Sequence, residues 1–135
     1  PAYLDRAGAP RAPADLAGHQ ILLTAGRAQP GEWRYAGADG RELVVKLRPR
    51  LTVSDVDATL SAARDGHGLA RPLSYQVAED LAAGRLARLL ERFEPAPLPV
   101  QLVTPSARLM PVRVRAFLDH AAAAIASLPV VRTSA

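Results

Sequence analysis

Cysteine is absent from this chain of 135 residues. Without thiols there is neither a disulfide framework nor a thiolate metal site, and cysteine usage says nothing about the redox compartment. No apolar run approaches the roughly 20 residues that span a bilayer, and no charged-then-apolar signal segment opens the chain. These absences argue against a disulfide-stapled scaffold and a helical membrane protein, and the cytoplasm is the expected location.

Lysine is almost absent as well, because Lys46 is the only one and the remaining basic residues are arginines. The net charge of +4 invites a nucleic-acid interpretation. However, the arginines are scattered singly from Arg6 to Arg132, whereas a DNA-binding surface needs basic residues concentrated on one face. The densest group, 41–50, alternates with apolar residues, as on the solvent face of a strand. We therefore expect no direct DNA binding by this chain.

What is present is the composition of a soluble globular domain. Apolar residues make up 49% and charged residues 22% of the chain, and its length suits one domain with a modest core. The chain starts at Pro1 rather than Met. We therefore expect a processed product, a fragment or an engineered piece.

Helical and strand-like patterns alternate along the chain. Helical pieces are predicted within 1–18, from Ser54 to Gly66, from Ser74 to Gly84 and from Pro111 onward. Strands are predicted at 19–24, 33–36, 42–48, 51–53, 69–73, 85–93 and 100–104, and the Asp39-Gly40 pair predicts a tight hairpin turn between the second and third of them. Residues 94–99 hold three prolines and predict an extended connector. This order predicts an α/β fold with a mixed central sheet flanked by helices.

Several segments in this order resemble the effector-binding domain of LysR-type transcriptional regulators. They are PAYL at 1–4, PADLAGH at 13–19, GEWR at 31–34, GADGRE at 37–42, GHGLA at 66–70, VAEDLAAGRL at 77–86, LPV at 98–100, TPS at 104–106 and RVRAFLD at 113–119, with the helix from Ser54 between them. The resemblance covers essentially residues 1–127. Arg71 stands where that family commonly has an apolar residue.

The resemblance implies a lobe of the type II periplasmic-binding-protein kind, with the effector in a cleft between two lobes. Residues 1–96 would be the second lobe, 97–128 a returning strand and C-terminal helix of the first lobe, and 129–135 a tail. The DNA-binding domain and most of the first lobe would lie outside this chain. Because the helix carrying Phe117 would then lack its partner surface, we expect the C-terminal segment to be swapped into a neighbouring molecule or folded onto 1–96.

The best candidate for a binding site is the turn formed by Val53, Ser54 and Asp55, where a predicted strand enters a helix. Free backbone N–H groups at a helix N-terminus, with a serine hydroxyl, suit a carboxylate or phosphate, and the resemblance implies that this turn faces the effector. The alternative is that Ser54 only caps its own helix. Asp55 and Asp57 favour that alternative, because their carboxylates complement the helix dipole and repel an anion.

Three further residues are candidate effector contacts. Thr24 follows a predicted strand, and the resemblance implies that it lines the cleft with Ala25 and Gly26, although a plain surface loop explains these residues equally well. Arg71 can grip a carboxylate with two hydrogen bonds, or it is a solvated arginine in an arginine-rich chain. Thr104, with Ser106 beyond it, would line the hinge side of the cleft or cap the last helix.

Nothing in the sequence predicts catalysis. His19, His67 and His120 lie on separate elements with no short ligand spacing, so no metal site is expected. There is no Gly-x-Ser-x-Gly elbow, and no glycine-rich phosphate loop. No cofactor is expected.

The predicted function is a non-catalytic effector sensor. The expected partners are a small, anionic effector, further copies of the same protein, and DNA through a domain outside this chain, with no membrane. One alternative is a solute-binding lobe for transport or substrate capture, which the same fold serves. Another is a purely structural oligomerisation piece.

Overall fold

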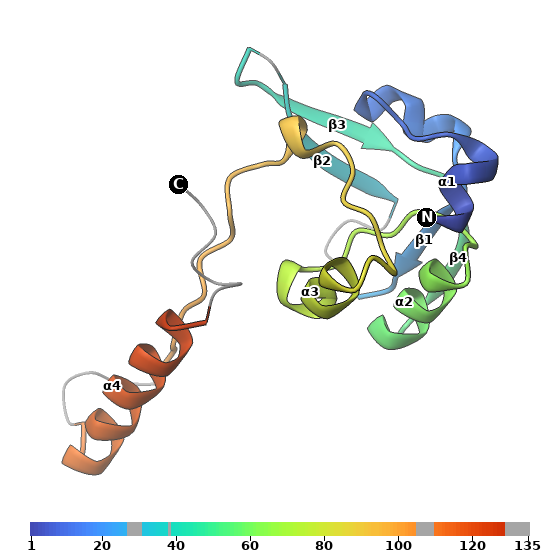
Figure 1. The fold of residues 1–135 in the computed structure, drawn as a ribbon. Coiled ribbons are helices and arrows are strands. Elements are labelled where there is room, and N and C mark those ends of the chain that lie inside the picture. The colour runs from blue at the N-terminus through green and yellow to red at the C-terminus, as the bar shows by residue number, and fades with distance from the viewer. Residues whose placement is uncertain (27–30, 38, 105–109, 129–135) are drawn as a thin grey trace. The chain divides into compact units, whose positions relative to one another are not determined.

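The computed structural model describes residues 1–26, 31–37, 39–104 and 110–128 of the chain. The chain divides into two compact units, Pro1–Ala96 and Pro97–Ala135. The first contains two small sheets and helices α1, α2 and α3, and the described part of the second contains helix α4 (Val112–Ala126) (Figure 1). The assignment of these units to the lobes of a two-lobed protein stays a prediction.

The N-terminal segment forms helix α1 (Ala2–Ala7) and the short 3-10 helix η1 (Pro13–Gly18), as predicted from the prolines. The carboxylate of Asp15 accepts hydrogen bonds from the backbone N–H groups of Arg11 and Ala12, at 2.8 and 2.9 Å. These bonds favour the charged carboxylate and lower the pKa of Asp15. These hydrogen bonds to Asp15 therefore stabilise the start of η1, although its N-cap residue, Ala12, has no polar side chain.

Two separate two-stranded sheets replace the single mixed sheet that the sequence predicts. Strand β1 (Ile21–Thr24) pairs in parallel with β4 (Pro49–Val53), and β2 (Glu32–Ala36) pairs antiparallel with β3 (Glu42–Lys46). Ile21 also forms a parallel bridge with Leu69. The α/β class is confirmed, and the parallel and antiparallel pairs simply belong to different sheets.

The hairpin turn is longer than the tight turn expected from Asp39-Gly40. Residue Ala36 pairs with Glu42, which leaves 37–41 between the strands, and Ala38 lies outside the described residues. The N–H of Gly37 donates to the carbonyl of Arg41 at 2.7 Å, and the Asp39 carboxylate accepts from the N–H of Arg41 at 3.1 Å. The aspartate side chain therefore stabilises a wider loop.

The core of the first unit lies between the two sheets and the N-terminal helices. Leu16, Ile21 and Leu22 are almost fully buried, as the apolar run at 21–23 predicts. The main apolar cluster comprises Tyr3, Leu16, Ile21, Leu23, Trp33, Tyr35, Leu47 and Leu69. Burial of these side chains is the main favourable contribution to the stability of this unit.

Helix α2 (Val56–Arg64) and helix α3 (Ser74–Ala82) are joined by a buried carboxylate. Asp80 of α3 accepts two hydrogen bonds from the Arg64 guanidinium, at 2.9 and 2.7 Å, and one from Arg85 at 2.5 Å. The Asp80 side chain is only 4% exposed. The hydrogen bonds from Arg64, and then those from Arg85, hold the pKa of Asp80 at about 2.

Three predicted strands are not found. The segment 69–73 contributes only the bridge at Leu69. Within 85–93, the N–H groups of Arg85 and Leu86 both bond to the carbonyl of Asp80, and Leu90 has a left-handed backbone with φ of 58°. These features turn the chain into the 3-10 helix η2 (Glu91–Phe93). Segment 100–104 forms no strand, because the described residues offer it no ladder partner.

Candidate effector pocket

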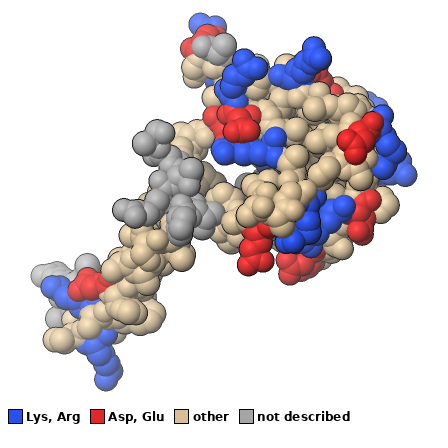
Figure 2. All heavy atoms as spheres, viewed as in Figure 1, with Lys and Arg blue, Asp and Glu red and all other residues tan. Residues whose placement is uncertain are grey.

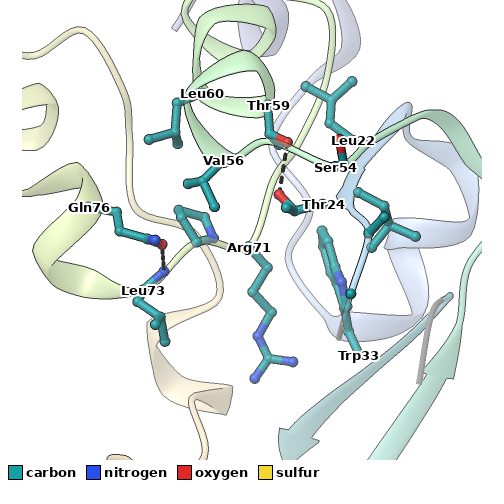
Figure 3. Close-up of a pocket in the computed structure, with 14 residues that line it drawn as sticks. Leu22, Thr24, Trp33, Ser54, Val56, Thr59, Leu60, Arg71, Leu73 and Gln76 are labelled. Carbon is teal, nitrogen blue, oxygen red and sulfur yellow. Dashed lines mark hydrogen bonds between the residues drawn. The ribbon is translucent and has the colours of Figure 1, made fainter. Parts of the chain in front are cut away.

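A pocket of about 280 Å³ lies where the parallel strands β1 and β4 end (Figure 3). Thr24 is paired with Val53 at these ends, and the N–H of Ala25 donates to the carbonyl of Val53 at 2.6 Å. The carboxyl ends of parallel strands are the usual place for ligands in α/β folds. The pocket is lined by Leu22, Leu23, Thr24, Ala25, Gly26, Trp33, Ser54, Val56, Thr59, Leu60, Arg71, Pro72, Leu73 and Gln76.

Thr24 lies in this pocket, and its hydroxyl is hydrogen bonded to a helix. The Oγ1 atoms of Thr24 and Thr59 are 2.8 Å apart. Thr59 is 4% exposed, and its own hydroxyl donates to the carbonyl of Asp55 at 3.0 Å. The hydroxyl of Thr24, at the end of β1, therefore contacts helix α2.

The turn at 53–55 differs in one respect from its prediction. Asp55, not Ser54, is the N-cap of α2, because its Oδ1 accepts from the N–H of Ala58 at 2.8 Å. Ser54 lines the pocket, whereas Val53 and Asp55 are not among the lining residues. Aspartate caps helices as well as serine does. Asp55, one residue after Ser54, also has the extended backbone that an N-cap residue needs. The expected conflict between capping and ligand contact therefore does not arise for Ser54.

Arg71 reaches the same pocket from the segment between Leu69 and helix α3. Its guanidinium carbon lies 5.0 Å from the centre of the Tyr35 ring, which is a cation–π contact. Tyr35 is buried, and this burial raises the pKa of its phenol, while the charge of Arg71 opposes the shift. The tyrosine ring therefore supports the arginine beside the pocket.

Thr104 belongs to the other unit, where it is half-buried, and its expected role stays a prediction. Ser106 lies outside the described residues. The structure thus brings Thr24, Ser54 and Arg71 to one pocket from three separate segments.

Several other residues that line the pocket were not predicted from the sequence. Thr59 lies three residues after Val56, on the inward face of α2 that also carries Leu60, so its position on an apolar face was the available signal. Gln76 accepts a hydrogen bond from the N–H of Leu73 at 2.8 Å, and Leu73 is the N-cap of α3, which begins at Ser74 as predicted. Trp33 is buried, and no local pattern indicates that it faces the end of β1.

The surface of the first unit carries charges of both signs. Figure 2 shows acidic side chains among the basic ones on the visible face of the first unit. Arg34 pairs with Glu42 at 2.6 Å, and Arg88 pairs with Glu94. This interspersed pattern is the one expected from the scattered arginines, and a concentrated basic face is not seen on this side.

The described parts of the chain show neither a cluster of metal ligands nor a membrane-spanning helix. They contain no group of three or more His, Cys, Asp or Glu side chains placed to hold a metal ion. His19 instead lies with Nδ1 3.1 Å from the hydroxyl of Tyr3. Among the described helices, none has the length and apolar character needed to cross a membrane.

Comparison with known proteins gives consistent relatives. The chain is 34% identical over 121 residues to the uncharacterized HTH-type transcriptional regulator YcaN of Escherichia coli, covering 89% of this chain and 39% of that protein. It is 37% identical over 126 residues to the HTH-type transcriptional regulator PtxR of Pseudomonas aeruginosa, covering 88% of this chain and 38% of that protein. The chain therefore spans about two fifths of the length of these relatives.

Solved structures give the same fold. The regulatory domain of AphB from Vibrio vulnificus matches with a TM-score of 0.75 at 23% identity, covering 92% of this chain and 61% of that one. The LysR-type regulator CrgA from Neisseria meningitidis matches with a TM-score of 0.63 at 29% identity, covering 72% of this chain and 32% of that one. The predicted fold, that of a LysR regulatory domain of the type II periplasmic-binding kind, is confirmed.

The family match extends over both units. The family model described as the LysR substrate binding domain matches residues 1–126. The relatives named above are HTH-type transcriptional regulators. This chain belongs to the LysR substrate-binding domain family.

Proposed function

We propose that this chain senses a small anionic effector on behalf of a bacterial LysR-type transcriptional regulator. The observation that supports this proposal best is the gathering of Thr24, Ser54 and Arg71 in one pocket at the ends of β1 and β4. The pocket also has apolar walls, as small-molecule sites do. The chain acts by binding and carries out no chemistry of its own.

The anionic character of the effector rests on the charges near the pocket. Arg71 is a permanent cation whose planar guanidinium binds a carboxylate through two parallel hydrogen bonds. The first turn of α2 adds backbone N–H groups, since helix geometry leaves them without intrahelical acceptors. Asp55 caps the N–H of Ala58, so its charge is already engaged with the helix. The positive charge of Arg71 therefore favours a ligand with a negative charge.

Regulation follows if the effector favours one arrangement of two lobes over another. In this proposal residues 1–96 are the second lobe, and 97–128 belong with the first lobe, most of which lies outside this chain. Val53 and Asp55 shape the turn that presents Ser54, and Thr104 is a further contact. The whole protein would be a homo-oligomer that binds DNA through a separate domain and acts in the cytoplasm. The regulator names of the relatives favour this function over a solute-binding lobe.

Effector binding can be tested directly on this chain by NMR. We would titrate isotope-labelled protein with small carboxylic acids and with their uncharged methyl esters. The expected result is that the acids, and not the esters, shift the amide signals of Thr24, Ser54 and Arg71. Signals that move only on other surfaces would contradict the proposal.

A charge-matched pair of variants sharpens this test. Arg71→Gln should abolish the preference for acids over esters, because it removes the cation beside the pocket. Arg41→Gln removes the same charge from a side chain that is 88% exposed and outside the pocket, so it should leave the preference intact. For regulation itself, the acid should change the affinity of the complete gene product for DNA.

A further inference from the structure

The hydroxyl groups of Thr24 and Thr59 have a defined hydrogen-bond direction. A threonine hydroxyl has one proton to donate and two lone pairs to accept with. Thr59 donates its proton to the carbonyl of Asp55, four residues earlier, which is a common arrangement for threonine within a helix. The 2.8 Å contact between the hydroxyls therefore takes its proton from Thr24.

This direction decides what Thr24 offers to a ligand. Because its proton points to Thr59, the Oγ1 atom of Thr24 meets a bound molecule with a lone pair, as a hydrogen-bond acceptor. Thr59 is buried, so water does not readily replace its bond to Thr24. A ligand oxygen without a hydrogen would face the Thr24 lone pair and lose a hydrogen bond that it makes in water.

The opposite chemistry is found at the other end of the pocket. Arg71 has only hydrogen-bond donors, and its guanidinium carbon lies 5.0 Å from the centre of the Tyr35 ring. In Figure 3 the Arg71 guanidinium lies well away from the Thr24–Thr59 pair. Leu22, Val56 and Leu60 add apolar surface to the pocket wall. The pocket therefore combines a donor-only end, an acceptor end and an apolar wall.

We infer that the effector is a bifunctional acid, with a carboxylate for Arg71 and a hydrogen-bond donor, a hydroxyl or ammonium group, for Thr24. This inference rests on the proposed function, and it narrows the ligand class. A plain monocarboxylate offers no hydrogen-bond donor to the lone pair of Thr24 Oγ1. A dicarboxylate places a second acceptor against that lone pair. The cavity of about 280 Å³ restricts the ligand to a small molecule.

A ligand series separates these classes on the wild-type chain. We would measure dissociation constants by NMR for pentanoate, for its 2-, 3- and 4-hydroxy derivatives, for the matching methoxy acids and for glutarate. The hydroxyl position is varied so that the donor can match the distance between Arg71 and Thr24. At least one hydroxy acid should bind about three- to tenfold more tightly than both pentanoate and its own methoxy analogue, which is the usual range for one hydrogen bond. Glutarate should bind no better than pentanoate.

Two variants assign the preference to Thr24. Thr24→Val keeps the shape of the side chain and the Thr59 bond to Asp55 while removing the acceptor, so hydroxy, methoxy and plain acids should bind alike. Thr24→Ser keeps a hydroxyl and should keep the preference, which guards against a general effect of substitution at this position.

The outcomes distinguish this inference from the proposed function. If acids bind but the methoxy acids or glutarate are preferred, or if the hydroxy preference survives Thr24→Val, the inference is wrong and the acid pocket stands. If none of the acids shifts the pocket signals, the proposed function fails, and the inference fails with it.

Discussion

The Asp80 carboxylate of helix α3 and the Arg64 guanidinium of helix α2 form a two-bond ion pair, with distances of 2.9 and 2.7 Å. Arg85 binds the other carboxylate oxygen. Helix α2 supplies Val56, Thr59 and Leu60 to the pocket, and α3 supplies Gln76. The ion pair therefore joins two helices that line the same pocket.

Asp80→Asn should lower the melting temperature of the chain. The substitution leaves two arginines beside a buried neutral amide, and loss of a buried acceptor costs more than loss of an exposed one. Asp39→Asn is a suitable control, because the Asp39 side chain is 61% exposed. Thermal unfolding followed by circular dichroism should show a larger decrease for Asp80→Asn, and equal decreases would contradict the role of the ion pair.

The same carboxylate should make the stability of the chain depend on pH in the acidic range. The pKa of Asp80 is about 2 in the folded chain and 3.8 ordinarily. Between these values the unfolded chain binds more protons at this site, so lowering the pH favours unfolding. The contribution of Asp80 is present above about pH 4 and is lost as the pH falls through about 2. Urea unfolding from pH 5 to pH 2 should show the difference between wild type and Asp80→Asn shrinking, and a difference independent of pH would refute this assignment.

Gly68→Ala should destabilise the first unit, because there is no room for a Cβ atom. A Cβ at this position would lie 2.4 Å from the carbonyl oxygen of Gln20, which is backbone and cannot rotate away. That carbonyl accepts the N–H of Leu69 at 2.8 Å, next to the bridge with Ile21. Overpacking of this kind costs roughly 1–3 kcal/mol. Gly18→Ala, where a Cβ meets nothing within 4 Å, is the matched control in urea unfolding. Equal stability of the two variants would show that the bridge adapts.

Leu60→Ala should weaken the packing of α2 under the pocket. Leu60 is 1% exposed, and removal of a leucine from such a site leaves a cavity and costs about 2–5 kcal/mol. Leu51→Ala removes the same atoms from a side chain that is 39% exposed, so the loss should be much smaller. The free energy of unfolding, measured with urea, compares the two. Similar losses would mean that Leu60 is not a core residue.

Much of the local structure could be predicted from sequence because it depends on near neighbours. The spacing of Val56, Leu60 and Ala63 indicated a helix with one apolar face, and Leu60 and Ala63 are buried in α2. The apolar run at 21–23 indicated a buried strand, which is β1. The strand predicted at 85–93 failed because its apolar residues do not decide the backbone there. The backbone there is set by two N–H hydrogen bonds to the Asp80 carbonyl and by the left-handed conformation of Leu90.

The candidate site was only partly predictable. Thr24, Ser54 and Arg71 were selected one at a time: Thr24 and Ser54 at the ends of predicted strands that the family resemblance places at the cleft, and Arg71 for its ability to bind a carboxylate. That they share one pocket follows from the parallel pairing of β1 with β4. The position of Thr59 on an apolar helix face was a local signal that it faces inward, but the sequence did not indicate that its partner is Thr24.

The sequence by itself determined the family of this chain, the helical and apolar patterns of α2 and α4, and the expectation of a binding site at a strand end. Only the tertiary structure decided that Asp55 rather than Ser54 caps α2, and that the hydroxyl oxygens of Thr24 and Thr59 lie 2.8 Å apart although 35 positions separate them in the chain. The physical reason is the separation of the interacting residues in the sequence. Periodicity reports which face of one element is apolar, whereas the partner of a side-chain hydrogen bond depends on which elements pack together.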